Sequence, residues 1–150
     1  MSNALRADRV TLAHVEVLSA LHGQCFEEGW SPDSMASLLS TPGTLGVIAV
    51  NETIDQPVGF ILMRIVAGEG EILTVGVVPD AQAKGIGTFL LGIMLQEAVE
   101  VIFLDVASDN EPAAKLYQRA GFEVVGHRPG YYKRAGGEPI DSLTMKYVLG

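Results

Sequence analysis

A glycine-containing segment in the middle of the chain has the composition of an anion-binding loop. Its sequence is Gln82-Ala83-Lys84-Gly85-Ile86-Gly87, and it follows a valine-rich stretch that ends at Pro79. Glycine lets backbone N–H groups come close to an anion, because no Cβ stands in the way. A helix that begins behind the loop adds unpaired N–H groups and the positive end of its dipole. The segment therefore predicts a phosphate or pyrophosphate site, with an ordinary glycine turn as the alternative.

Two familiar phosphate-binding motifs do not fit this segment. The dinucleotide fingerprint Gly-x-Gly-x-x-Gly would need a third glycine where the chain has Leu90. A Walker loop would end in Gly-Lys-Ser or Gly-Lys-Thr, which is missing here. The observed pattern is Gln-x-x-Gly-x-Gly, so neither a Rossmann oxidoreductase nor a P-loop nucleotidase is predicted.

Two carboxylates are candidate general bases. Asp105 interrupts an otherwise apolar strand-like stretch over residues 101–106, where a charged side chain needs a partner or a role. Burial raises the pKa of a carboxyl group and makes it a better base. The alternative for Asp105 is a side chain at a sheet edge, paired with a cation. Glu71, at the start of another strand, is the rival base or a solvated strand end.

The elements that position these residues follow from hydrophobic periodicity, caps and turn residues. We expect helices over Val10–Phe26, Ser31–Leu39, Ile86–Ala98 and Glu111–Ala120. We expect strands over Leu45–Val50, Pro57–Val66, Glu71–Val78, Val101–Ala107, Phe122–His127 and Leu143–Val148, the first three as an antiparallel meander. This order predicts a mixed α/β sheet covered by helices.

The connection near Val99 is unusually short for a helix followed by a strand. Two to six residues are usual between such elements, and none of the expected glycines is present. Either the turn is very tight, or a mobile loop is absent from the sequence at this point.

Length and composition describe a folded domain. The chain has 150 residues, of which 48% are hydrophobic and 19% are charged, so we expect one domain over residues 1–150. The single cysteine, Cys25, excludes an internal disulfide and indicates a reducing compartment. We find no signal peptide and no apolar run of membrane-spanning length, which favours a cytoplasmic protein without a membrane partner.

The charge balance also bears on partners. There are 18 acidic and 10 basic side chains, for a net charge of −8. Such a surface repels nucleic-acid phosphates and favours a basic partner, unless the charge serves only solubility. His14, His22 and His127 show no metal-ligand spacing, so we assign them no role and expect no metal.

In combination, these segments resemble the GNAT superfamily of N-acetyltransferases. The resemblance covers most of residues 45–148 and rests on Glu71-Ile-Leu-Thr-Val-Gly-Val-Val-Pro79, Gln82-x-x-Gly85-x-Gly87, Asn110 and Leu116-Tyr117-x-x-x-Gly121-Phe122. Each piece is weak alone, but their order and spacing together are specific. The resemblance implies a GNAT fold of the α/β (α+β) class. We expect a mixed, mostly antiparallel sheet of about six to seven strands flanked by about four helices.

Within that superfamily, the chain is most similar to the ribosomal-protein-alanine N-acetyltransferase branch, which acetylates protein N-termini. The similar segments are Trp30-Ser31, Leu104-Asp-Val-Ala-Ser-Asp-Asn110, Gly130-Tyr131-Tyr132 and Asp141-Ser-Leu-Thr-Met145. The chain departs from the branch at Asp105, Ala107 and Gly130, where the branch has Glu, Arg and Asn. These departures concern the identity of the acceptor more than the class of reaction.

The resemblance implies acetyl-CoA as donor and coenzyme A as product. The implied cofactor-binding residues are Val75, Gly76, Val77, Gln82, Ala83, Lys84, Gly85, Ile86, Gly87, Thr88 and Asn110. Backbone N–H groups of Ala83–Thr88 would hold the pyrophosphate, and those of Val75–Val77 the pantetheine arm and the thioester oxygen. Asn110 would hydrogen-bond the arm, or would instead cap the following helix.

The implied chemistry is direct attack by a neutral amine. Asp105 is the expected base, acting through a water because it is one methylene shorter than Glu, and Glu71 is the rival. Tyr117 is the expected acid that reprotonates the leaving thiolate, with a core aromatic as the alternative. Trp30, Tyr131 and Tyr132 are the expected acceptor-binding residues, the two tyrosines lying in a loop where they clamp a peptide or merely pack.

The favoured function is therefore acetylation of the N-terminal α-amine of a protein, possibly a ribosomal protein, by a monomer or weak homodimer. One alternative is a small-molecule amine or lysine acetyltransferase on the same fold. A second is a CoA-binding sensor domain without catalysis.

Overall fold

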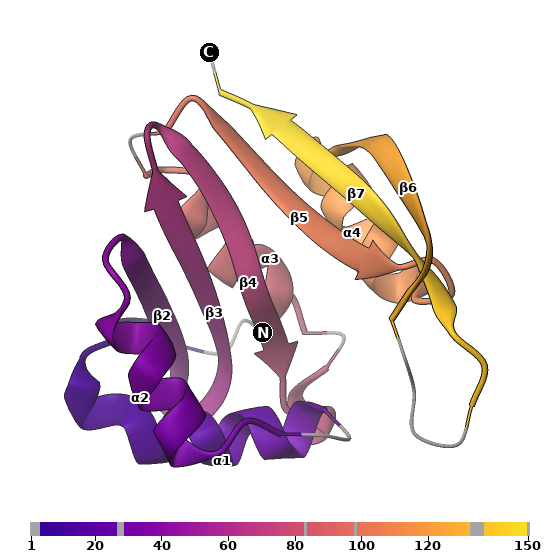
Figure 1. The fold of residues 1–150 in the computed structure, drawn as a ribbon. Helices are drawn as coiled ribbons and strands as arrows, with labels where there is room; N and C mark the ends of the chain where they lie inside the picture. The colour runs from indigo at the N-terminus through magenta and orange to yellow at the C-terminus, as the bar shows by residue number, and fades with distance from the viewer. Residues whose placement is uncertain (1–3, 27–28, 83, 98, 133–136, 150) are drawn as a thin grey trace.

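Seven strands form one mixed sheet, in the order β1-β2-β3-β4-β5-β7-β6, in the computed structural model of the chain (Figure 1). The structure describes residues 4–26, 29–82, 84–97, 99–132 and 137–149. The strands are β1 (Leu5–Arg9), β2 (Thr44–Asn51), β3 (Gln56–Val66), β4 (Glu69–Val77), β5 (Val101–Ala107), β6 (Glu123–Tyr132) and β7 (Ile140–Val148). The helices are α1 (Val15–Cys25), α2 (Pro32–Ser40), α3 (Ile86–Met94) and α4 (Glu111–Ala120), with short 3-10 turns at Leu12–His14 and Pro79–Ala81. The predicted fold class is confirmed.

Helices cover both faces of the sheet, α1 and α2 on one and α3 and α4 on the other (Figure 1). Along β2, Ile48 and Val50 pack into the cluster that includes α1 and α2, whereas Val47 and Ala49 pack into the cluster with α3 and α4. This alternation follows from the two-residue period of a strand. It explains why β2 and β3 are almost continuously apolar, since both of their faces are buried.

Strands β4 and β5 are paired along only part of their length and then diverge, which opens the sheet. They are paired in parallel at only three positions, the last of which is Glu71 with Phe103. On the β3 side, Leu62 pairs with Thr74 and Met63 with Ile72, so Leu73 is an extra residue on β4. Such a bulge bends its strand and increases its twist. Beyond it, β4 and β5 diverge in a V that is plain in Figure 1.

The N-terminal strand was not expected from the sequence. The polar pentapeptide of β1 pairs antiparallel with β2 from Leu5–Asn51 to Arg9–Val47. Its side chains alternate weakly because β1 is an edge strand with one side of its ladder open. The predicted first helix was also too long, because Thr11 caps a 3-10 turn and α1 begins only at Val15.

The short connection before β5 has a simple explanation. The prediction that the third helix continues to Ala98 is wrong, because α3 ends at Met94. Turn-like hydrogen bonds follow, from Gln96 N–H to Ile93 O and from Glu97 N–H to Met94 O. The helix is therefore shorter than its apolar sequence suggests, and the residues after Met94 supply the turn.

Candidate functional site

A cleft of about 1280 Å³ lies where β4 and β5 diverge, and α3, α4 and the end of α1 contribute to its walls. This volume exceeds the roughly 300–1,000 Å³ of common small-molecule pockets, so the cleft can take a long ligand. Most residues singled out from the sequence line it: Trp30, Val75, Gly76, Val77, Gln82, Gly85, Ile86, Gly87, Thr88, Asp105, Asn110, Tyr117 and Tyr132. Lys84, Glu71 and Tyr131 are not among its lining residues, and Ala83 lies outside the described residues.

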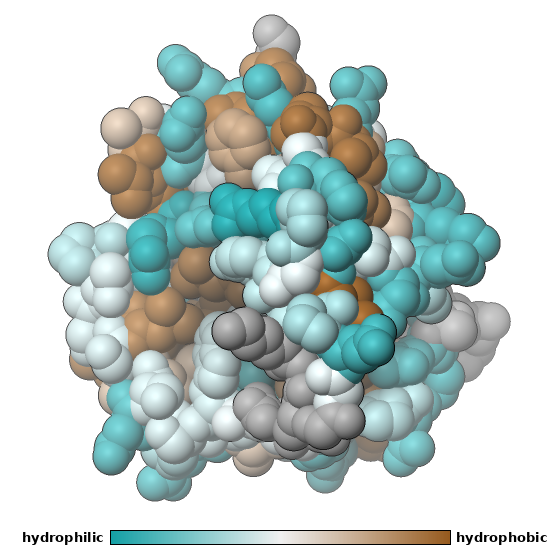
Figure 2. All heavy atoms as spheres, turned by 45° about the vertical axis from the view of Figure 1, so that its right-hand side comes forward, coloured by the Kyte–Doolittle hydropathy of each residue, from teal (hydrophilic) through white to brown (hydrophobic). Residues whose placement is uncertain are grey.

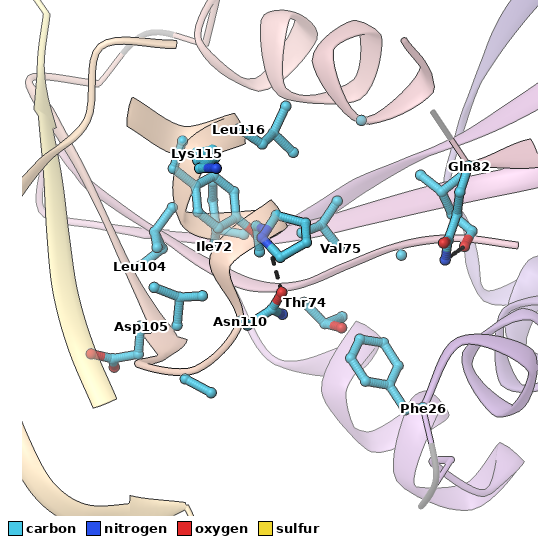
Figure 3. Close-up of a pocket in the computed structure, with 18 of the residues that line it drawn as sticks. Phe26, Ile72, Thr74, Val75, Gln82, Leu104, Asp105, Asn110, Lys115 and Leu116 are labelled. Carbon is cyan, nitrogen blue, oxygen red and sulfur yellow. Dashed lines mark hydrogen bonds between the residues drawn. The ribbon is translucent and has the colours of Figure 1, made fainter. Parts of the chain in front are cut away.

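The surface view agrees with this arrangement. Seen from the side that brings β6 and β7 forward, the molecule is hollowed left of the centre, where hydrophobic side chains are exposed among hydrophilic ones (Figure 2). Within the close-up of the cleft, Gln82 lies at one end and Asp105 at the other, with Val75, Thr74 and Asn110 between them (Figure 3). The cleft therefore joins the glycine loop to the candidate base.

At the loop end, the start of α3 offers backbone donors. Gly85 is the N-cap of α3 in the left-handed conformation, with φ +80°, and no side chain caps the helix there. The first N–H groups of a helix have no partner within the helix, so these are available to an anion. The Gln82 side chain donates to the Val77 carbonyl at 3.2 Å and ties the loop to the end of β4. These features support the predicted phosphate-binding role of the segment.

Substituting Gly85 with alanine is expected to destabilise the protein. A Cβ at position 85 would have room around it, but an alanine held in the left-handed conformation at φ +80° costs about 1–2 kcal/mol. The matched control is Gly92→Ala, in the interior of α3 with nothing close to its Cβ position, which should stabilise by about 0.5–1 kcal/mol. Thermal unfolding of the two variants should therefore shift in opposite directions, by about 2–4 °C per kcal/mol. Melting temperatures that shift in the same direction in both variants would contradict backbone strain at position 85.

At the other end, two hydroxyl groups of β7 hold the Asp105 carboxylate. Thr144 Oγ1 donates to Asp105 Oδ1 at 2.7 Å, and Ser142 Oγ lies 3.5 Å from the same oxygen. Thr144 is the cross-strand partner of Asp105, so the sheet register places this bond. Asp105 is half-buried rather than buried, and no ion pair to it is found within the described part of the chain. Hydroxyl donors, and not a cation, therefore orient this carboxylate.

Asp105 also borders a second cavity, of about 510 Å³. Among the residues that the structure describes, only Leu104 and Asp105 line both cavities. The second cavity carries the charged side chains of Arg64, Glu69, Glu71 and Arg128. Asp105 thus lies at the boundary between the two cavities, whereas Glu71 is a lining residue of the second cavity alone.

Tyr117 and Asn110 come from α4. Tyr117 is buried, and burial, with a smaller effect of Tyr132, raises its pKa to about 12. Its phenol therefore keeps its proton throughout the neutral range. Asn110 caps α4 by accepting from the Ala113 N–H at 3.3 Å (Figure 3). The capping bond uses only Oδ1 and does not involve the Nδ2 group. Asn110 can therefore cap α4 and still offer a donor to a cofactor.

Sequence reasoning missed His22, which lines the cleft although we assigned it no role. Its ring stacks on Phe26 at 4.4 Å and on Trp30 at 4.3 Å between centroids. Trp30 N–H donates to His22 Nδ1 at 3.2 Å, and Ser19 Oγ donates to the Trp30 carbonyl at 2.6 Å. Trp30 is thereby fixed against α1, so His22 organises an aromatic wall that Trp30 alone could not form. The spacing of His22 and Phe26, one helical turn apart, was the available signal.

His22 should make the stability of the protein depend on pH. Burial lowers its pKa below the ordinary value of 6.5, so the folded protein favours the neutral ring. The unfolded chain then binds more protons below about pH 6.5, and the free energy of unfolding falls as the pH decreases from there to the pKa of the folded state. Urea unfolding at about pH 7.5 and about pH 5.5 measures this loss, which His22→Gln should reduce. An unchanged difference in the variant would show that other groups cause it.

The tyrosine pair does not lie in a loop as expected. Tyr131 and Tyr132 end β6, and their rings are edge-to-face at 5.1 Å. Tyr132 lines the cleft, whereas Tyr131 is 49% exposed and packs under the Arg128 guanidinium at 4.8 Å from its ring. The structure therefore brings Tyr132, but not Tyr131, to the site.

Within the described residues, no group of three or more metal-binding side chains is found, and no helix is long and apolar enough to cross a membrane.

Comparisons with known proteins agree with this geometry. Residues 15–122 match the model of the acetyltransferase (GNAT) family. The N-alpha-acetyltransferase RimI of Mycobacterium tuberculosis is 32% identical over 146 residues, which cover 94% of this chain and 90% of that protein. A 71-residue stretch, 47% of this chain, is 42% identical to the uncharacterised protein ML0378 of Mycobacterium leprae, but it spans only 20% of that protein. The ribosomal-protein-S18-alanine N-acetyltransferase of Escherichia coli has the same fold, with a TM-score of 0.88, 21% identity and coverage of 97% and 94% of the two chains.

Proposed function

Because the chain belongs to the GNAT family of acetyltransferases, we propose that it transfers an acetyl group from acetyl-CoA to the N-terminal α-amine of a protein. A ribosomal protein is the favoured acceptor, since the E. coli protein of the same fold is named for acetylating the alanine of ribosomal protein S18. The observation that carries the proposal is the position of Asp105, at the end of the cleft opposite the glycine loop, where the acceptor amine would meet the thioester of the donor.

The cleft fits acetyl-CoA in shape and chemistry. Its loop end has the N-terminus of α3 without a side-chain cap for a pyrophosphate, and its volume of about 1280 Å³ has room for a pantetheine arm. Beyond Glu71, the edge of β4 that faces the cleft is released from β5, so its backbone groups need other partners. Val75, Gly76 and Val77 lie on that edge. Their backbone groups would hold the arm and stabilise the oxyanion of the tetrahedral intermediate.

The proposed reaction needs one proton acceptor and one proton donor. Acetyl-CoA supplies an acetyl group activated as a thioester. The amine attacks in its neutral form, and Asp105 takes the proton that the nitrogen gives up as it bonds to the acetyl carbon, directly or through a water. The carbon–sulfur bond then breaks, and Tyr117 gives its proton to the leaving thiolate. The products are the acetylated amine and coenzyme A, and proton exchange with solvent returns Asp105 to the carboxylate and Tyr117 to the phenol.

The chemistry of the base favours an α-amine over a lysine. An α-amino group has an ordinary pKa of about 7.7–8.0, whereas that of lysine is about 10.4. A carboxylate held by two hydroxyl donors is a modest base, which suffices for a group that is already partly neutral near pH 7. Tyr132 and the His22–Trp30 wall add large rigid surfaces that suit a peptide better than a small amine.

The test is acetyl transfer to a panel of acceptors. One arm uses basic peptides with a free N-terminal alanine, and its control uses the same peptides with a blocked N-terminus and a free lysine. A third arm uses polyamines and single amino acids. Turnover in the first arm alone supports the proposal. Turnover only in the control or the third arm would replace it with lysine or small-molecule acetylation, and binding without any turnover would leave a sensor domain.

We also propose that residues 1–150 act as one N-acetyltransferase domain in the cytoplasm, as a monomer or weak homodimer. The continuous seven-stranded sheet supports the first part, because the proposed donor and acceptor sites share one cleft at the β4–β5 junction.

A further inference from the structure

We propose that Asp141 is a positioning residue for the acceptor: its carboxylate shapes a bulge of β6 that sets Tyr132 in the wall of the cleft. This inference rests on the proposed function, because the acceptor is the ligand that Tyr132 would contact. It concerns a side chain that neither lines the cleft nor takes part in the proton transfers.

The bulge is defined by the pairing of β6 with β7. Arg128 pairs with Ser142 and Tyr132 with Ile140, so three residues of β6, numbers 129–131, lie opposite Asp141 alone. The central one, Gly130, has φ +61°, in the left-handed region. A bulge of this kind has no regular ladder to hold it, so its shape depends on particular hydrogen bonds.

Asp141 supplies those bonds. Gly130 N–H donates to Asp141 Oδ1 at 2.8 Å, and His127 Nε2 lies 2.9 Å from Oδ2. The Asp141 carbonyl accepts from Ser108 N–H at 2.8 Å, which ties the same residue to the end of β5. The Gly130 N–H, followed by His127, lowers the pKa of the Asp141 carboxyl, so it is ionised near neutral pH. Both carboxylate oxygens therefore have a partner on β6: Oδ2 contacts His127, before the bulge, and Oδ1 accepts from Gly130, within it.

The residue at the end of the bulge lies among the reactive groups. Tyr132 lines the cleft, hydrogen-bonds Ser142 and helps to raise the pKa of Tyr117. Ser142 is fully buried, with Oγ 3.5 Å from Asp105 Oδ1. A change in the bulge would therefore move a wall of the acceptor end of the cleft, while the glycine loop, built from other elements, would keep its shape.

Kinetics of Asp141→Ala and Asp141→Asn test the inference. Asp141→Ala should raise the KM for the acceptor peptide by about tenfold and leave the KM for acetyl-CoA within about twofold. Asp141→Asn keeps an oxygen for the Gly130 N–H and should restore most of the peptide KM. The matched control is Asp8→Ala. Asp8 is also a partly exposed carboxylate with a side-chain partner, Arg6, but it lies in β1 at the opposite edge of the sheet. Asp8→Ala should change neither KM.

A second readout keeps this inference separate from the proposed function. Hydrogen exchange of the Gly130 amide, measured without any acceptor, should become faster in Asp141→Ala and stay slow in Asp8→Ala. If the wild-type protein acetylates no peptide, the proposed function fails, and the exchange measurement still decides whether Asp141 holds the bulge. If the wild-type protein acetylates peptides and Asp141→Ala leaves the peptide KM unchanged, or leaves the Gly130 amide protected, the inference is overturned.

Discussion

Replacing Tyr117 with phenylalanine is expected to lower kcat by about 10²–10⁴-fold, the usual contribution of a general acid. The substitution removes one oxygen from a buried ring and keeps the edge-to-face packing on Phe122, whose centroid lies 5.9 Å away. The leaving thiolate then has no positioned proton donor, while the proposed acetyl-CoA-binding residues are untouched. Steady-state kinetics with a peptide acceptor, together with acetyl-CoA titration by calorimetry, measure the two effects separately.

Tyr147→Phe is the matched control for this experiment. Tyr147 belongs to the same aromatic cluster, with its ring 5.4 Å from that of Phe122, but it does not line the cleft. We expect its kcat to remain within about twofold of the wild type. Equal losses in the two variants would point to a packing role for both tyrosines. An unchanged kcat in Tyr117→Phe would remove Tyr117 from the mechanism.

The second large effect is expected at Asp105. Asp105→Asn should lower kcat with a peptide acceptor by about 10²–10⁴-fold, because an amide cannot take the proton from the amine. The asparagine oxygen can still accept from Thr144, so the hydroxyl network that orients the side chain is preserved. Pre-steady-state and steady-state rates with the same peptide would show whether the lost rate belongs to acetyl transfer rather than to product release.

Glu71→Gln is the internal comparison for Asp105→Asn, since Glu71 is the rival base. Glu71 is exposed, faces only the second cavity and lies at the last paired position of β4 and β5. We therefore expect kcat to change by no more than a few-fold, with any effect falling on the peptide KM. The opposite result, a large loss in Glu71→Gln and a small one in Asp105→Asn, would assign the base to Glu71. Large losses in both would mean that the two carboxylates act together through water.

Much of the site followed from local sequence features. The glycine loop, the helix behind it and the Asn110 cap are segments of fewer than ten residues whose conformation depends on their own side chains. A carboxylate in an apolar strand marks Asp105, and the glycine-containing segment marks the loop donors, whereas the role of Tyr117 follows from the resemblance of Leu-Tyr-x-x-x-Gly-Phe to the GNAT superfamily. Glu71 was the rival candidate, and in the structure its absence from the lining of the cleft separates it from Asp105.

Most of the features that sequence reasoning missed depend on contacts between distant segments. Three of them are properties of strand register: the pairing of β1 with β2, the extra residue Leu73 and the three-residue bulge opposite Asp141. His22 became part of the site because α1 ends beside Trp30 and the cleft, a contact that spacing along the chain does not reveal. Register is set by the whole hydrophobic pattern and by neighbouring strands, so one strand's sequence underdetermines it.

The sequence by itself predicted the reaction class through the resemblance of its combined motifs to the GNAT superfamily, and most of the candidate chemical groups through residue types at short spacing. The tertiary structure alone decided how the groups meet. The divergence of β4 from β5 created the cleft, and the register of β7 against β5 placed Thr144 and Ser142 on Asp105. Catalytic geometry needs side chains from separate strands and helices within hydrogen-bonding distance, and only the packed sheet supplies that proximity.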